Sequence, residues 1–358
     1  MPSLKEIKVR INSISSTLAI TSAMKMVAAA KLQKAQMAIQ NMLPYERRLH
    51  SMLIDLMGAM NISAAASEDG SVRGSGSAER GFDQSGDRLS LSNRHDLAGM
   101  DGAYSLMAQR EVRKVAIVAF ASNSSLCGAF NSNVIREATA VINEYRASGL
   151  GDADITVYSV GRKMAEAMKK LGFPSPADFT KMSDSPSYDA ASALAQELFD
   201  GFVSGRFDKV ELVYNHYKST SSQPTTRQTY LPLSLADATA DLQAGKITDS
   251  ASETDTNRGA EPVGAPVVRQ GSPTTEDLIV EPSKEALIAT LLPKVIRLRI
   301  FTTLLDSAAA EHAARTVAMQ LATDNGNDLL QELTLEYNKG RQQKITSEIL
   351  DLVGGSMQ

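Results

Sequence analysis

The chain has 358 residues, of which 43% are hydrophobic and 22% are charged, as in a protein that buries a core. Its net charge of -4 excludes a globally basic nucleic-acid binder, and its single cysteine, Cys127, excludes a disulfide framework within the chain. The length exceeds what one compact core usually needs, so we expect two domains, or one domain with an extension.

The first sixty residues carry a continuous heptad pattern. Steps of three and four residues from Leu4 to Met60 reach seventeen positions, and fourteen of these are apolar. Such spacing, kept over many heptads, predicts a coiled-coil helix about 85 Å long. A helix of that length projects beyond a small globular domain or has another protein around it. Pro44 removes one backbone donor, so we expect a bend or a local break there.

Polar and charged residues further characterise this helix. Thr21 and Lys25 interrupt the apolar stripe together, where a paired helix prefers apolar side chains. Residues 1–60 hold eight cations and three anions, a local net charge of +5. This excess indicates an acidic protein partner, anionic lipid or nucleic acid, or simply a solvated charged face. Tyr45 is the one aromatic residue among these cations, and this scarcity of aromatics disfavours nucleic acid. We expect no signal peptide and no membrane span, since helical sequence starts at once and no run of 18 apolar residues occurs.

Two polar segments without apolar periodicity, 62–105 and 236–275, enclose an alternation of strands and helices. The predicted strands are 114–120, 155–160, 209–214 and 226–231. The predicted helices are 131–147, 161–171 and 188–204. This alternation indicates a mostly parallel sheet with helices on its faces.

From about 284 to 353 the sequence is helical again. Pro293 should kink the first turns. Alanines crowd residues 308–322, where they favour the helix and allow a neighbouring helix to approach closely. Ile345 and Ile349 return to three–four spacing, so we expect them in the core of the coil.

The predicted fold class is α/β with a long antiparallel coiled coil, in which the N- and C-terminal helices pair around a central Rossmann-like α/β domain. The predicted divisions are an N-terminal helix (1–61), a polar insertion (62–105), the α/β domain (106–235), a second polar insertion (236–275) and a C-terminal helix (276–358).

The sequence offers no pattern for catalysis. It lacks a phosphate-binding G-x-x-x-x-G-K-[ST] loop, and its four histidines are scattered without metal-ligand spacing. The turn at 122–131 follows the first strand, where α/β folds bind phosphates, but it lacks G-x-G-x-x-G and reads as a structural turn. Cys127 within it reads as a small buried thiol. We therefore expect no catalytic site, no cofactor and no metal in this chain.

Several long strings carry a resemblance to a known family. They are ITSAMKMVAAAKL at 20–32, LCGAFN at 126–131, SQPT at 222–225, AMQLATDNG at 318–326 and LTLEYNKGRQQKITSEI at 333–349. These strings closely resemble the gamma subunits of bacterial F-type ATP synthases, over nearly the whole chain except 62–105 and 236–275. The chain departs from the family pattern at 123–125, where Asn-Ser-Ser replaces an acidic-basic-glycine triplet.

The resemblance implies a non-catalytic rotor subunit of the central stalk. Its coil would turn inside a ring of alpha and beta subunits and couple c-ring rotation to the beta catalytic sites. Its α/β domain would contact the epsilon subunit and the c-ring. The chain would thus lie peripherally at the cytoplasmic face of the bacterial inner membrane, with no nucleic acid among its partners.

The resemblance also implies contacts with the alpha/beta hexamer at six residues. These are Met24, Lys25, Arg341, Gln342, Thr346 and Glu348. Thr21 and Lys25 are expected to face beta rather than the partner helix of the coil.

Two other functions remain open on the residues alone. One is a coiled-coil scaffold with an α/β domain, unconnected with ATP turnover. The other is an enzyme that binds a nucleotide or a small acyl substrate in the α/β domain, which the missing phosphate loop and acid–base cluster disfavour.

Overall fold

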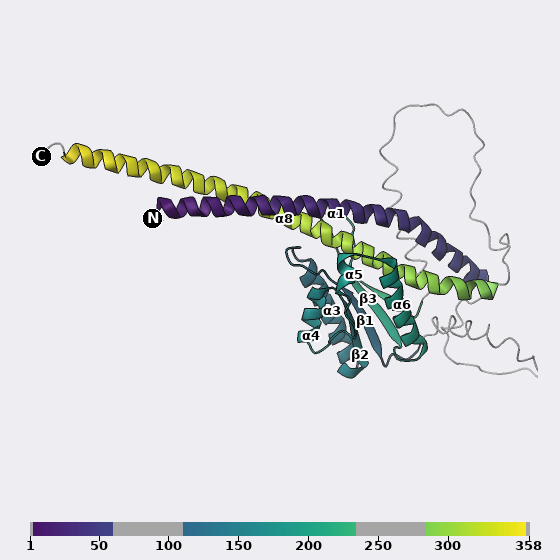
Figure 1. Cartoon of the computed structure of the whole chain (residues 1–358). Helices are drawn as coiled ribbons and strands as arrows, with labels where there is room; N and C mark the ends of the chain where they lie inside the picture. The colour runs from purple at the N-terminus through teal and green to yellow at the C-terminus, as the bar shows by residue number, and fades with distance from the viewer. Residues whose placement is uncertain (1–2, 60–109, 234–283, 356–358) are drawn as a thin grey trace, which may run out of the picture.

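The computed structural model describes residues 3–59, 110–233 and 284–355 (Figure 1). Two long helices cross as a rod, and an α/β domain lies against one end of it. The polar segments 62–105 and 236–275 lie outside the described residues, so their interpretation as insertions stays a prediction.

The rod consists of α1 (Leu4–Ala59) and α8 (Lys284–Gly355), of 56 and 72 residues. At about 1.5 Å per residue they are roughly 84 and 108 Å long. A reciprocal capping box begins α1, because the amide of Ser3 donates to Glu6 Oε2 and the amide of Glu6 donates to Ser3 Oγ. Leu18 lies against Gly326, whereas Leu4 lies against Gly340. The helices therefore run antiparallel, as predicted.

The heptad stripe of α1 is the face that packs. Every stripe position from Leu4 to Leu56 is buried or half-buried, and almost all other positions in the first five turns are exposed. Both helices run without a break through a proline, Pro44 in α1 and Pro293 in α8. The local break predicted as one outcome at Pro44 does not occur, because only one backbone hydrogen bond is lost while the packed stripe continues on both sides.

The α/β domain contains a four-stranded sheet in the order β2-β1-β3-β4. Its strands are β1 (Val115–Phe120), β2 (Ile155–Val160), β3 (Lys209–Asn215) and β4 (Thr225–Leu231). The pairs of β1 with β2 and β3 are parallel, and β4 is antiparallel to β3. The mostly parallel sheet is thus confirmed.

Helices cover both faces of this sheet. One face packs on α3 (Phe130–Ala147) and α4 (Arg162–Lys170). The other face packs on α6 (Tyr188–Val203) and on the first half of α8, with the C-terminal part of α1 beside them. The short helices α5 (Thr180–Asp184) and η2 (Asp152–Asp154) were not predicted. Since α8 belongs both to the rod and to the domain core, the two parts share one hydrophobic core.

One carboxylate is buried inside the domain. Glu211 on β3 accepts hydrogen bonds from Tyr145 Oη at 2.6 Å and from Arg227 Nε at 2.7 Å, and its Oε1 lies 2.7 Å from Lys209 Nζ. Burial raises the pKa of Glu211, but these hydrogen bonds outweigh burial, so the pKa lies below the ordinary 4.5. Glu211 is therefore a charged, fully paired group that ties α3, β3 and β4 together.

Candidate interaction surface on the coil

The polar residues singled out from the sequence in the middle of α1 form hydrogen bonds within the coil. Lys25 Nζ donates to Gln320 Oε1 of α8 at 2.7 Å, and Gln320 Nε2 in turn donates to both carboxylate oxygens of Asp324. The hydroxyl of Thr21 lies 3.2 Å from that of Thr323. The expectation that Thr21 and Lys25 face away from the partner helix is therefore wrong. The two residues form a polar layer across the coil, in which each break in one stripe is matched by a polar residue in the other.

The exposed apolar side chains on the outer face of α1 were not singled out from the sequence. Met24 is half-buried, but Met26 and Val27 are 63% and 58% exposed, and Val9 and Ile20 are exposed as well. Val9, Ile20 and Val27 are spaced by 11 and 7 residues, which places them on one side of a helix. The available signal was apolar residues outside the heptad register, in a segment otherwise rich in exposed Lys and Arg.

The four residues predicted near the C-terminus lie where α8 has passed the beginning of α1. Arg341, Gln342, Thr346 and Glu348 are all exposed. Thr346 Oγ1 donates back to the carbonyl of Gln342 at 2.9 Å, and Glu348 lies 3.8 Å from Lys344 in a solvent-exposed pair. These contacts are local to one helix and leave the outward surface available.

The prediction that Ile345 and Ile349 belong to the coil core is wrong. Their side chains are 47% and 55% exposed. Leu4, at the first turn of α1, lies against Gly340, so α1 offers no turn to pack on residues further along α8. We call residues 341–355 the tip. Its exposed large aliphatic residues are Ile345, Ile349, Leu350, Leu352 and Val353.

The six predicted residues therefore form two separate groups. Lys25 is paired with Gln320, and Arg341 lies 21 residues further along α8, about 30 Å away along the helix axis. The predicted contacts thus lie at two different heights along the coil.

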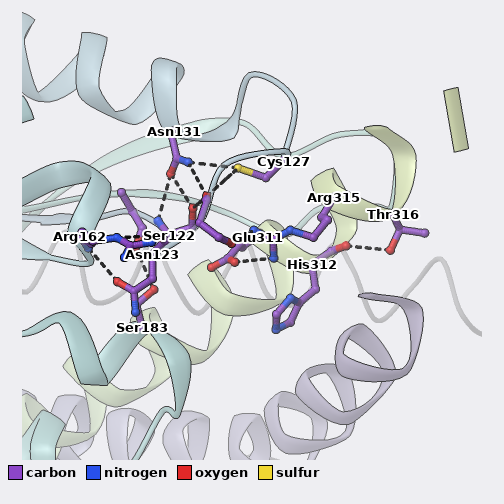
Figure 2. A network of polar contacts seen from close by, with 12 residues as sticks. Ser122, Asn123, Cys127, Asn131, Arg162, Ser183, Glu311, His312, Arg315 and Thr316 are labelled. Atoms are coloured by element: carbon purple, nitrogen blue, oxygen red, sulfur yellow. Dashed lines mark hydrogen bonds and ion pairs between the residues drawn. The ribbon is translucent and has the colours of Figure 1, made fainter. Parts of the chain in front are cut away.

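The turn between β1 and α3 is occupied by its own hydrogen bonds (Figure 2). The carbonyl of Ser124 accepts from Ser122 Oγ at 2.6 Å and from Asn131 Nδ2 at 3.2 Å. The guanidinium of Arg162 donates to the carbonyl of Asn123, and Arg315 of α8 donates to Ser124 Oγ at 2.7 Å. These contacts fasten the turn to α4 and α8, in agreement with the structural interpretation of this turn.

Cys127 and its neighbours are apolar anchors of that turn. Cys127 and Phe130 are buried against Ala310 of α8, which confirms the predicted buried thiol. Leu126 is different: its φ of 68° is unusual for a bulky residue, and its side chain is 58% exposed. The strained backbone thus presents an apolar side chain to solvent at the side of the rod.

The ionisable residues of α8 beside this turn are tuned by burial (Figure 2). Burial raises the pKa of Glu311, which pairs with Arg315 at 2.7 Å. Burial lowers the pKa of His312 to about 4, so this imidazole is neutral at neutral pH. Among the described residues, no group of three or more His, Cys, Asp or Glu side chains is arranged to hold a metal ion. Of the helices that the structure describes, none has the length and apolarity to cross a membrane.

Comparisons with known proteins cover the whole chain. Residues 3–357 match the family model described as ATP synthase. The ATP synthase gamma chain of Phocaeicola vulgatus is 47% identical over 357 residues, and that of Bacteroides thetaiotaomicron is 45% identical over 358 residues, each with 100% of both chains covered. A chain of the Euglena gracilis mitochondrial ATP synthase, in a structure of its OSCP, F1 and c-ring, has a TM-score of 0.52 at 18% identity. That match covers 99% of this chain and 93% of the other, and it shows a shared fold.

Proposed function

The chain belongs to the ATP synthase family, whose gamma chains it matches from end to end, and we propose that it is the rotating central shaft of a bacterial F-type enzyme. In this role the coil stands inside a ring of alternating alpha and beta subunits. The α/β domain lies outside the ring, against the epsilon subunit and the c-ring. Proton flow turns the c-ring, and the asymmetric coil then drives the three beta sites through different nucleotide affinities. The catalytic groups belong to beta and alpha.

The single observation that carries this proposal is the tip of α8. Among the described residues, 341–355 extend beyond α1 without a neighbouring helix, and an isolated helix of this length is marginally stable in water. The tip nevertheless exposes five large aliphatic side chains, whose burial is worth about 25 cal/mol per Å² of apolar surface. A collar of surrounding subunits supplies both the missing support and the missing apolar contacts.

The two groups of predicted contacts then have different partners within the ring. We infer that Met24 and Lys25 meet an acidic segment of beta partway along the coil. The ammonium of Lys25 has three donors, so its bond to Gln320 leaves donors for a carboxylate of beta. Arg341, Gln342, Thr346 and Glu348 contact loops of the hexamer around the tip, where their side chains are exposed.

The same proposal gives the location of the chain. The α/β domain reaches the membrane only through the c-ring, so the chain is peripheral, at the cytoplasmic face of the bacterial inner membrane. The exposed cations Lys5, Lys8 and Arg10 in the first turns of α1 lie along the part of the coil that enters the ring. They complement acidic surfaces of alpha and beta.

The test is purification of the complex from detergent-solubilised source membranes by a tag on this chain. We expect native mass spectrometry to find one copy of the chain with a hexamer of two larger subunits, and the eluate to hydrolyse ATP. Recovery of the chain alone, or with an unrelated helical partner and no ATPase activity, would support the coiled-coil scaffold instead.

Point variants refine the test. Arg341→Ala should lower ATP hydrolysis by the purified complex, because it removes a charged contact at the tip. Lys170→Ala is the matched control, since Lys170 is an exposed cation in the last turn of α4, away from the coil. Equal activity of the two variants would remove Arg341 from the contact surface.

A further inference from the structure

Three parts of the molecule meet at one loop. The loop between β3 and β4, residues 216–224, reaches from the α/β domain to both helices of the rod. The ring of Tyr217 packs in an apolar cluster with Leu32 of α1 and Ala309 of α8, and also in a second cluster with Phe130 of α3. Tyr217 is therefore a side chain of the domain that contacts α1, α8 and α3 together.

Hydrogen bonds hold Tyr217 to each helix separately. Its hydroxyl accepts from Gln36 Nε2 of α1 at 2.6 Å. Its backbone amide donates to Asp306 Oδ1 of α8 at 2.9 Å. The second oxygen of the same carboxylate lies 2.6 Å from His216 Nδ1. Asp306 thus binds two adjacent residues of the loop, and Gln36 of α1 donates the third hydrogen bond.

The loop itself is braced from inside. The amide of His216 donates to the carbonyl of Pro224 at 2.9 Å, which closes the base of the loop. The side-chain amide of Gln223 donates to the carbonyls of Ser219 and Thr220. At the end of β3, Asn215 Nδ2 donates to the carbonyl of Phe130. A braced loop transmits displacement instead of absorbing it.

We propose that Tyr217 and His216 clamp both helices to the α/β domain, so that the domain and the two-helix coil turn as one body. This inference rests on the proposed rotor function and assigns positioning residues within it. The clamp lies near the end of the contact between coil and domain. The larger apolar core extends along α8 to Leu304, Asp306 follows directly, and the turn before α3 then contacts Ala310 and Arg315. Without the clamp, turning of the domain would reach α1 and α8 unequally.

The test uses the assembled complex with the hexamer fixed to a surface and a bead on the α/β domain. The angular spread of the bead is measured while the enzyme waits for ATP. Tyr217→Ala should widen the angular spread, and Tyr217→Phe should widen it less, because only the bond to Gln36 is lost. Ser221→Ala is the matched control, since the Ser221 hydroxyl lies 3.5 Å from that of Ser219 within the same loop.

A pH profile distinguishes loss of the clamp from a general loosening of the α/β domain. Hydrogen bonding to Asp306 raises the pKa of His216 above the ordinary 6.5, against burial and the nearby charge of Lys218. The His216–Asp306 contact is thus at full strength below pH 6.5 and weakens as pH rises through the folded-state pKa. The angular spread of the unchanged complex should widen over that rise. His216→Gln should remove the step.

The outcomes distinguish the clamp from the rotor function. An active, rotating complex in which Tyr217→Ala and Ser221→Ala have the same angular spread overturns the clamp and leaves the rotor function intact. Absence of an ATPase complex overturns the rotor function itself. In that case a double-mutant cycle on the full chain still tests the contact. Gln36→Met and Tyr217→Phe should each raise the unfolding equilibrium constant about fivefold, and the double variant no further. Additive effects would overturn the contact.

Discussion

A substitution at Gly161 tests how tightly the turn after β1 is built. Gly161 follows β2 with φ +96°, a conformation that favours glycine. An added Cβ would lie 2.0 Å from the carbonyl oxygen of Ala121 and 2.8 Å from its carbon. Both are backbone atoms at the end of β1, so no side-chain rotation relieves the overlap. Gly161→Ala must therefore move backbone.

The expected cost combines strain and lost hydrogen bonds. Holding alanine at this φ costs about 1–3 kcal/mol. Separating the two segments weakens two backbone hydrogen bonds, from Ala121 to Val160 at 2.8 Å and from Lys163 to Ser122 at 3.2 Å. Each is worth about 1 kcal/mol. We expect Gly161→Ala to lower the free energy of unfolding by about 3–5 kcal/mol.

Gly172→Ala provides the matched control. Gly172 has a similar φ of +90°, but an added Cβ would meet nothing within 4 Å. It should therefore cost only the strain, about 1–3 kcal/mol. Urea unfolding of the full chain, followed by tyrosine fluorescence, measures both variants because Tyr145, Tyr158 and Tyr230 report on the domain core. If the two variants lose the same stability, the close approach of Gly161 to Ala121 is not a constraint.

Three further predictions concern charge and the coil. Because the folded-state pKa of Glu211 is lowered, its contribution to stability is complete above the ordinary pKa of 4.5 and is lost as pH falls through the folded-state pKa. Glu211→Gln should therefore lower the free energy of unfolding by about 3–5 kcal/mol at pH 7 and by much less in acid, which urea titrations at both pH values would reveal. A chain that stops after Gly340 should unfold at the same urea concentration as the full chain but recover less hexamer in the tagged purification, since the tip packs on no part of α1. Lys25→Ala should lower stability by less than about 1 kcal/mol, because its bond to Gln320 is solvent-exposed; a larger loss in circular-dichroism melts would contradict this.

The sequence predicts the packed face of α1 well but not the end of the coil. Heptad spacing depends on which side of a helix is covered, so the burial of Leu32, Leu49 and Leu53 follows from the pattern. The same pattern predicted a coil core at Ile345 and Ile349. Periodicity identifies an apolar face but does not say which chain covers it, and α1 is too short to reach these residues.

The clamp was beyond sequence reasoning for a different reason. His216 and Tyr217 lie in a loop without periodicity, and their partners Asp306 and Gln36 are 90 and 181 residues away along the chain. The polar layer at Thr21 and Lys25 was noticed but assigned to the wrong neighbour. A polar break in one stripe indicates that a partner is needed, and only the register of the opposite helix shows that Thr323 and Gln320 supply it.

The size of the side chains along α8 varies with the neighbours that pack against it. Between 309 and 314 alanines alternate in direction, with Ala309 and Ala313 against α1 and Ala310 and Ala314 against the turn before α3, so both neighbours come close. At Gly326 and Gly340, α8 lies against α1, and the two glycines contact Leu18 and Leu4 of that helix. Exposed leucines occur along this paired part as well (Leu321, Leu329 and Leu335), and the tip carries five more large aliphatic residues although α1 has ended. Large apolar side chains on a lone helix cost solubility without adding stability, so their presence in the tip indicates a neighbour from another chain.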